Sequence, residues 1–302
     1  MSDERLTAIE TALQSRVRER GPVRMGILFT QHDQHRMMSL GSMVRDGWLF
    51  PILVGSADNI ETTVKGATLE EGSYEAVEAD TLEEQTAAAL DLADKAKLDA
   101  LGFSPHVAEE AVPLLQAAGG DLFPEHQPLM GLAAVALPEF PRLLFVGDVA
   151  VKQAPTVEEK AWIAEQAAVT VQALSVDEPR VAFLAAVEAT NPGMPVTVEA
   201  EEAASKAQVQ GAHMHGPLSM DVAINRTAAE KKKVPGEVPG RADILVGPTL
   251  TISRGVYQAM ALLCGGRAGV TLLGGKLPVA IPGRADGDAG VLLSTMITAA
   301  LA

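Results

Sequence analysis

The run VAFLAAV, residues 181–187, constrains the fold of this chain more than any other segment. All seven residues are apolar, and a strand that is apolar on both faces is typical of a parallel sheet covered by helices. Polar residues follow at once, with Glu188, Thr190 and Asn191, and Pro192 then forces a turn. Because ligands of open α/β sheets bind beyond the carboxyl ends of the strands, the sequence predicts a binding site here.

Apolar runs alternate with helical segments through most of the sequence. Further strands are expected at 25–29, 50–54, 98–103, 132–137, 143–146, 212–215, 243–246, 268–273 and 278–281. This alternation predicts an α/β fold with parallel sheets and right-handed crossovers. The chain has 302 residues, which exceeds the size at which a single core stops growing, so two domains that share a cleft are expected.

The charge of the chain argues against two classes of partner. The formal net charge is -15, and nucleic acid or an anionic membrane surface would repel such a chain. The basic run Lys231–Lys233 is the only cluster of its kind in the sequence, and we expect it to be a solvated helix end. The sequence therefore predicts no nucleic-acid partner and no membrane partner.

Several features predict a cytoplasmic protein. The segment MSDERLTAIE starts with acidic residues and has no apolar stretch, so it does not resemble a secretory signal. No apolar run approaches the ~18 to 20 residues of a membrane span. The lone cysteine, Cys264, cannot form an internal disulfide, which suits a reducing compartment. Its apolar neighbours predict a small core residue.

Five segments carry a family resemblance. They are DVAVKQAP (148–155), VAFLAAVEATNPGMPVTVEA (181–200), HGPLSMDVAI (215–224), GRADILVGP (240–248) and LLGGKLPVAIPGRAD (272–286). Together they resemble the phosphate acetyltransferase and phosphate butyryltransferase family, and its butyryl branch in particular. The order and spacing are those of the family across half of the chain, whereas the N-terminal part matches only in rhythm.

The resemblance implies both a fold and an activity. The fold would be a two-domain α/β protein of the isocitrate/isopropylmalate-dehydrogenase-like type, with mostly parallel sheets and an interdomain cleft. Residues 1–140 and 276–302 would form one domain, and residues 141–275 the other. The activity would be that of a phosphate acyltransferase, which moves a short acyl group reversibly between coenzyme A and inorganic phosphate. Coenzyme A or acyl-coenzyme A would be a substrate, no cofactor or metal would be needed, and the protein would be a homodimer.

This reaction needs a base for the thiol and donors for phosphate. A free thiol has a pKa near ~8.5, so a carboxylate base or a nearby positive charge must help to remove its proton. Phosphate and the developing oxyanion are best held by arginine. The resemblance implies Arg284 as this donor and Asp286 as the candidate base, although an aspartate before a helix can equally be an N-cap.

The other candidate site residues come from the polar end of the 181–187 strand, from the matched segments, and from 249–254, where the family has Asp-x-Glu-x-Gly-Asn and this sequence departs from it. The substrate-binding candidates are Glu188, Thr190, Asn191, Lys152, Thr251, Arg254, Gly274, Gly275, Lys276 and Gly283. Asn191 could donate its amide to phosphate or only form a turn before proline, and Lys276 could be an exposed turn lysine. Asp148 and Asp221 also match the family, and both could be structural.

Some positions depart from the family pattern. No Lys or Arg lies between Lys97 and Arg142, where the family has a Lys-Gly pair and an arginine-rich segment. Gly283 replaces the serine before the family's arginine. Arg254 and Lys152 could restore positive charge from new positions. A non-catalytic or regulatory relative that binds coenzyme A, acyl-coenzyme A or phosphate without turnover is therefore an alternative, as is another reaction on the same scaffold.

The histidines suggest a rival metal site. His213 and His215 are two residues apart on an expected strand and would face the same side. They could join His32 or His35 as ligands of a metal ion.

Overall fold

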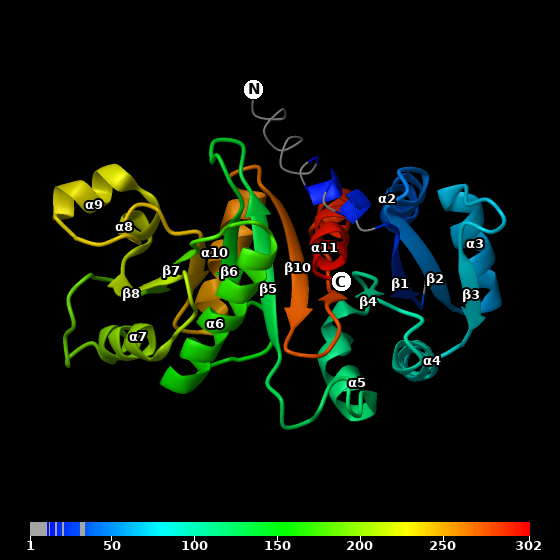
Figure 1. Ribbon diagram of the computed structural model, residues 1–302, viewed down its shortest axis with the longest axis horizontal. Coiled ribbons are helices and arrows are strands. Elements are labelled where there is room, and N and C mark those ends of the chain that lie inside the picture. The colour runs from blue at the N-terminus through cyan, green and yellow to red at the C-terminus, as the bar shows by residue number, and fades with distance from the viewer. Residues whose placement is uncertain (1–10, 12, 16, 20, 31–33) are drawn as a thin grey trace. The chain divides into compact units, whose positions relative to one another are not determined.

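The computed structural model describes all residues except 1–10, 12, 16, 20 and 31–33, and the chain forms two compact units (Figure 1). Unit 1 comprises Met1–Leu129 and Arg267–Ala302, and unit 2 comprises Met130–Gly266. These limits differ by several residues from the domain limits expected from the sequence, which stay a prediction. Each unit is described by itself.

Unit 1 contains a largely parallel sheet in the order β3-β2-β1-β4-β11-β10. The strands are β1 (Val23–Leu28), β2 (Leu49–Gly55), β3 (Glu75–Glu78), β4 (Ala100–Phe103), β10 (Arg267–Leu273) and β11 (Val279–Ala280). Only the β10–β11 pair among these described strands is antiparallel. Its helices are α2 (Gln34–Arg45), α3 (Ala57–Ala67), α4 (Leu82–Asp94), the short η1 (Ala108–Glu110), α5 (Ala111–Ala118) and α11 (Gly287–Leu301).

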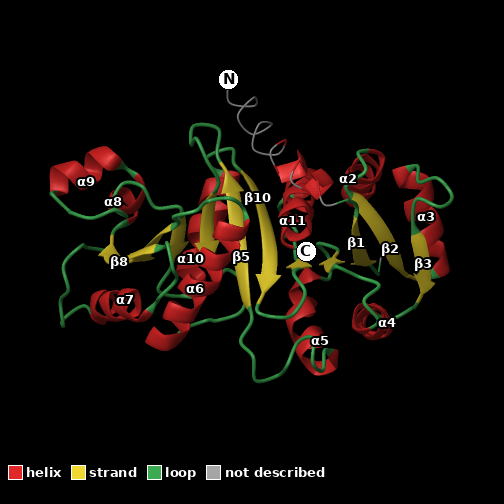
Figure 2. Cartoon of the chain, viewed as in Figure 1, coloured by secondary structure: helices red, strands yellow, loops and turns green. Residues whose placement is uncertain are grey.

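Unit 2 contains a second run of strands in the order β5-β6-β9-β7-β8. They are β5 (Met130–Ala136), β6 (Leu144–Gly147), β7 (Arg180–Leu184), β8 (His213–Leu218) and β9 (Ile244–Val246), and all pairs except β5–β6 are parallel. The helices are α6 (Val157–Ala173), α7 (Pro195–Lys206), α8 (Met220–Ile224), α9 (Arg226–Lys232) and α10 (Leu250–Leu262). Figure 2 shows helices beside the strands of both units. The mixed α/β fold with mostly parallel strands is confirmed.

The local sequence explains where these elements begin and end. Thr156 accepts a hydrogen bond from the backbone of Glu159, and the Glu159 side chain accepts one from Thr156 in return. This capping box satisfies two donors at the start of α6. The strands β4 and β5 are buried along their whole length, as expected of strands covered on both faces.

Two local expectations were wrong. The strand predicted at 181–187 ends at Leu184. Its register with β9 ends at Phe183 and its register with β8 ends at Leu184, and Val187 is exposed. Cys264, predicted in the core, is also exposed. Helix α10 ends at Leu262, so the residues that follow leave its buried face. None of the described helices is long and apolar enough to cross a membrane.

Candidate functional site

The topology of unit 2 gathers most of the predicted polar residues at one edge of its sheet. Strands β6, β9, β7 and β8 are parallel neighbours, so their carboxyl ends lie at the same edge. The segments 148–156, 248–254, 185–194 and 219–221 follow these strands, and we call this edge the carboxyl edge of unit 2. Lys152, Asn191 and Thr251 all lie in the segments that start there.

Asp148 organises the loop that follows β6. Its side chain is buried and accepts hydrogen bonds from four backbone amides, those of Gly131, Ala150, Val151 and Lys152, at 2.6–3.2 Å. Burial raises the pKa of Asp148, and these hydrogen bonds oppose that rise. Asp148 therefore has a structural role in holding the backbone of the loop.

The two cations expected to restore positive charge, Lys152 and Arg254, lie in different parts of this edge, the loop after β6 and helix α10. Lys152 Nζ lies 2.7 Å from Glu159 Oε1, and the hydrogen bond from Lys152 is the main cause of a lowered pKa of Glu159. Arg254 and Thr251 are exposed near the N-terminus of α10. Part of the charge of Lys152 is therefore already balanced by Glu159 in the first turn of α6.

Glu188 belongs to a polar cluster of four side chains. Ser219 Oγ donates to the Glu188 carboxylate and lies 2.5 Å from an oxygen of Asp221. Lys232 Nζ lies 3.0 Å from Glu188 and 3.2 Å from Asp221. Burial raises the pKa of Glu188, but the hydrogen bonds from Ser219 and Lys232 outweigh burial and lower it. Sequence reasoning missed Ser219 and treated Lys232 only as part of a solvated helix end.

Asn191 forms the turn that leads into α7. Its Oδ1 accepts a hydrogen bond from Gly193 N at 2.8 Å, and its backbone N–H donates to Thr197 Oγ1 at 2.8 Å. The turn-forming role expected as one alternative is therefore present. Asn191 and Thr190 are both exposed, and no described residue accepts a hydrogen bond from the Asn191 side-chain amide, so ligand binding through this group is compatible with the turn.

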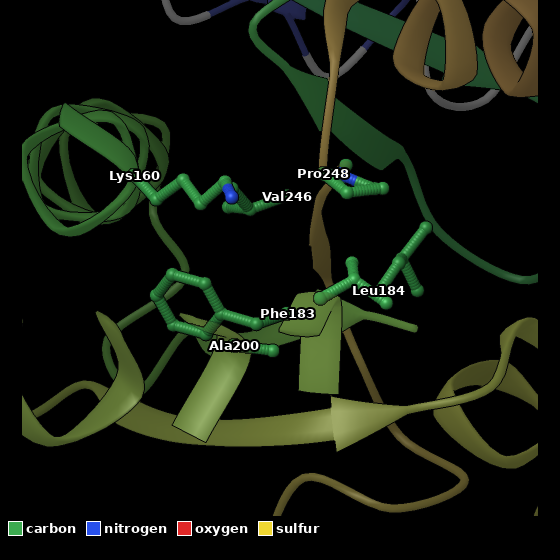
Figure 3. A pocket seen from close by; sticks show the side chains of 8 residues that line it. Lys160, Phe183, Leu184, Ala200, Val246 and Pro248 are labelled. Atoms are coloured by element: carbon green, nitrogen blue, oxygen red, sulfur yellow. The ribbon is translucent and has the colours of Figure 1, made fainter. Parts of the chain in front are cut away.

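The sequence showed the Glu159–Lys160 pair as a further match to the family, but it assigned no role to Lys160, which is buried at this edge. Lys160 lines a small pocket together with Phe183, Leu184, Val196, Ala200, Val246, Gly247 and Pro248, and Figure 3 shows its side chain reaching from α6 toward Val246. The pocket has room for about one water molecule. One signal was available, since Lys160 shares helical spacing with Ile163, Ala164 and Ala167, which are all buried.

Arg284 lies in unit 1, at the end of the sheet where the parallel strands β4 and β11 finish. Its guanidinium donates to the backbone oxygen of His106 at 3.1 Å and lies 3.7 Å from Glu109 Oε2. The side chain is 56% exposed, so these weak contacts leave much of the guanidinium accessible to an anion.

Asp286 closes the turn before α11. Its Oδ2 accepts a hydrogen bond from Gly283 N at 2.8 Å, and Asp286 N donates to Gly283 O at 3.1 Å. Asp286 occupies the N-cap position of α11, but its side chain makes no capping hydrogen bond to the helix. The carboxylate is thus oriented by the turn that also carries Arg284.

Gly274, Gly275 and Lys276 lie at the opposite end of β11 from Arg284, because β10 and β11 are antiparallel and these residues connect them. The connection needs glycine. A Cβ on Gly275 would lie 2.2 Å from the Phe123 ring, and Gly274 has a φ of 107°. Lys276 is exposed and donates its backbone N–H to Leu122 O.

The histidines gave the rival interpretation of a metal site. His213 and His215 both lie on β8, and burial lowers the pKa of His215. His32 lies outside the described residues, and His35 lies in α2. Among the described residues no group of three or more His, Cys, Asp or Glu side chains is placed to hold a metal ion.

Comparison with known sequences gives one family. The family described as "Phosphate acetyl/butaryl transferase" matches residues 124–299. A phosphate acetyltransferase from Thermotoga maritima is 32% identical over 174 residues, which cover 57% of this chain and 59% of that relative. A probable phosphate butyryltransferase from Bacillus subtilis is 36% identical over 169 residues, 55% of this chain and 56% of the relative. The matched part thus spans less than two thirds of the length of both curated relatives.

Comparison with solved structures supports the same architecture. The crystal structure of a branched-chain phosphotransacylase from Enterococcus faecalis superposes with a TM-score of 0.80 and 24% sequence identity, and the match covers 92% of this chain and 98% of that one. At this identity the likeness shows the fold.

Proposed function

The chain belongs to the phosphate acetyl/butyryl transferase family, and we propose from this that it is a phosphate acyltransferase. In the proposed reaction, acyl-coenzyme A and inorganic phosphate give acyl phosphate and coenzyme A, reversibly. The observation that carries the proposal is the extent of the family match. Residues 124–299 include every catalytic and substrate-binding residue predicted from the sequence.

Arg284 and Asp286 have complementary roles in the proposal. In the direction from acyl phosphate, the thiol of coenzyme A loses its proton, its sulfur attacks the acyl carbon, and phosphate leaves. Asp286 would accept the thiol proton, and its carboxylate is already oriented by Gly283 N. Arg284 would donate to the phosphate or to the carbonyl oxygen as negative charge develops. The exposure of its guanidinium supports this role.

The remaining residues would bind the substrates. Asn191 would donate its side-chain amide to phosphate, next to Thr190 and Glu188, while Lys152 and Arg254 would add positive charge. The proposed set also keeps Thr251, Gly274, Gly275, Lys276 and Gly283. Because the acyl group passes directly between thiol and phosphate, the proposed mechanism needs no cofactor and no metal.

A specific observation favours a second candidate function. Arg284 already contacts Glu109 and the His106 carbonyl oxygen, and the sequence has no Lys or Arg at 98–141. A relative that binds coenzyme A, acyl-coenzyme A or phosphate without turnover would tolerate such a loss of phosphate-binding cations.

One experiment separates the two functions. Acyl-coenzyme A and phosphate are mixed with the protein, and the release of free thiol is followed. We expect turnover in the natural protein and a loss of about 100-fold in Arg284→Ala, the size typical of a lost oxyanion donor. Arg18→Ala is a matched control, because Arg18 makes a similarly loose surface pair with Asp46 at 3.6 Å. Coenzyme A binding without turnover would refute catalysis and support the second function.

Assembly and location are further parts of the proposal. A homodimer would cover the large apolar side chains exposed on and after α10, where Ile252 is 47%, Leu262 64% and Leu263 84% exposed. Light scattering in solution measures this directly, and a monomeric mass at working concentrations would contradict it. An exposed free Cys264 suits the reducing cytoplasm, and fractionation of the source cells tests that location.

A further inference from the structure

Lys160 places a positive charge inside unit 2. It is 4% exposed, and the apolar side chains of Phe183, Leu184 and Val246 surround its pocket (Figure 3). Burial of an ammonium group is unfavourable unless the charge is paired. Its position on α6 suits an apolar residue, because the neighbouring positions on that face are buried. The retained charge therefore calls for an explanation.

The charge of Lys160 is paired with α7. Its Nζ lies 2.5 Å from Glu199 Oε2, so the pair joins α6 to the second turn of α7. A second pair, between Lys206 and Glu158, joins the same two helices at the same distance of 2.5 Å, but its side chains are 50% and 70% exposed. The pair of Lys160 and Glu199 differs because its lysine side chain is only 5% exposed, although that of Glu199 is 44% exposed. It also lies at the carboxyl edge, where the loop 185–194 enters α7.

The start of α7 is in turn linked to Asn191. Thr197 is fully buried, and its hydroxyl accepts a hydrogen bond from Asn191 N at 2.8 Å and lies 2.8 Å from Met194 O. Thr197 is two residues before Glu199. Any shift of this part of α7 therefore moves the turn that presents the Asn191 side chain.

We infer that Lys160 is a positioning residue, which fixes the start of α7 through Glu199 and so holds the Asn191 turn in its ligand-binding geometry. This inference rests on the proposed function, in which Asn191 binds phosphate. An apolar pair would join the two helices equally well, but it would lack the directional contact that sets the position of α7 along α6. Lys160 acts through Asn191 and does not itself touch the substrate.

The test compares Lys160→Met with Lys206→Met. Methionine keeps most of the length of lysine without its charge, and Lys206→Met removes the exposed pair between the same helices. In Lys160→Met we expect the KM for phosphate to rise about tenfold. If the Asn191 turn occupies its ligand-binding geometry in only about a tenth of the molecules, the apparent affinity for phosphate falls by the same factor. The kcat should stay within about twofold, since the lost contribution is uniform binding. Lys206→Met should change neither value.

Hydrogen exchange of the free protein gives a readout that does not depend on turnover. We expect faster exchange of the amides in 186–194 in Lys160→Met and not in Lys206→Met. Glu199→Gln removes the charge of the partner while nearly preserving its shape, and it should change exchange and KM in the same direction even if Lys160→Met fails to fold.

Two outcomes are distinguishable. Equal KM and equal exchange in all the variants, with only thermal stability changed, would overturn the inference and leave Lys160 with a structural role alone. A natural protein without turnover would refute the proposed function, while the exchange comparison would still decide whether Lys160 positions the loop.

Discussion

The buried carboxylate of Asp148 gives a prediction whose magnitude follows from its hydrogen bonds. Asp148→Ala removes the acceptor of four backbone amides, which belong to Gly131, Ala150, Val151 and Lys152. Each lost bond has a net effect of about 1 kcal/mol, so the sum is about 4 kcal/mol. Burial, which raises the pKa of Asp148, shows that the charge itself is disfavoured and reduces this figure. We expect a loss of about 2 to 4 kcal/mol.

The conservative variant Asp148→Asn refines the prediction. An amide oxygen in the place of Oδ1 still accepts from Gly131, Ala150 and Val151. In the natural protein Lys152 N donates to Oδ2 at 2.6 Å. In the variant an amide nitrogen would take the place of Oδ2, so this strong hydrogen bond is lost and two N–H donors face each other. We therefore expect a loss of about 1 to 2 kcal/mol of stability. The order of stability should be the natural protein, then Asn, then Ala.

Urea unfolding at neutral pH measures both variants, with the free energy taken from the midpoint and slope. Asp91→Ala is the control, because it breaks an exposed pair with Lys95 and should change stability by less than about 0.5 kcal/mol. The expected loss for Asp148→Ala is a large part of the ~5 to 15 kcal/mol of a typical domain. An Ala variant as stable as the control would refute the assignment of Asp148 as the organiser of this loop.

Two further predictions concern unit 2. The net lowering of the Glu188 pKa means that its stabilising contribution is complete above about pH 4.3 and is lost as pH falls through the lowered value. Lys232→Met removes one of the interactions that lower the pKa of Glu188 against the effect of burial. The melting temperature of this variant should therefore begin to fall at a higher pH than that of the natural protein. An unchanged dependence of the melting temperature on acid pH would contradict this. The side chain of Asp243 is 3% exposed and lies 2.5 Å from Arg142. Asp243→Ala should lower the free energy of unfolding by about 3 kcal/mol, because it leaves the arginine without its partner. The control is Glu237→Ala, which breaks an exposed pair with Arg241 and should lower the free energy of unfolding in urea by less than about 0.5 kcal/mol. Equal losses in the Asp243 and Glu237 variants would refute the importance of burial.

The sequence by itself determined the fold class and the edge at which to look for a site. Periodicity and turn residues are local properties, so the apolar runs located most strands, and the polar residues after them located the carboxyl edge of unit 2. Local pattern also has limits. The run 181–187 is apolar throughout, but a strand continues only while a neighbour pairs with it. The register of β7 ends at Phe183 with β9 and at Leu184 with β8. The prediction that Cys264 lies in the core was wrong for a different reason, because apolar neighbours in the sequence do not require burial.

Only the tertiary structure decided which side chains meet. Glu188 and Lys232 are separated by 44 residues, and Lys160 and Glu199 by 39, so no spacing rule connects them. Their contacts arise because parallel strands bring segments that are distant in the chain to a common edge. The antiparallel β10–β11 pair likewise moves Gly274–Lys276 to the end of β11 opposite Arg284. The sequence determines which polar and charged side chains follow each strand. The direction and order of the strands decide which of these side chains become neighbours.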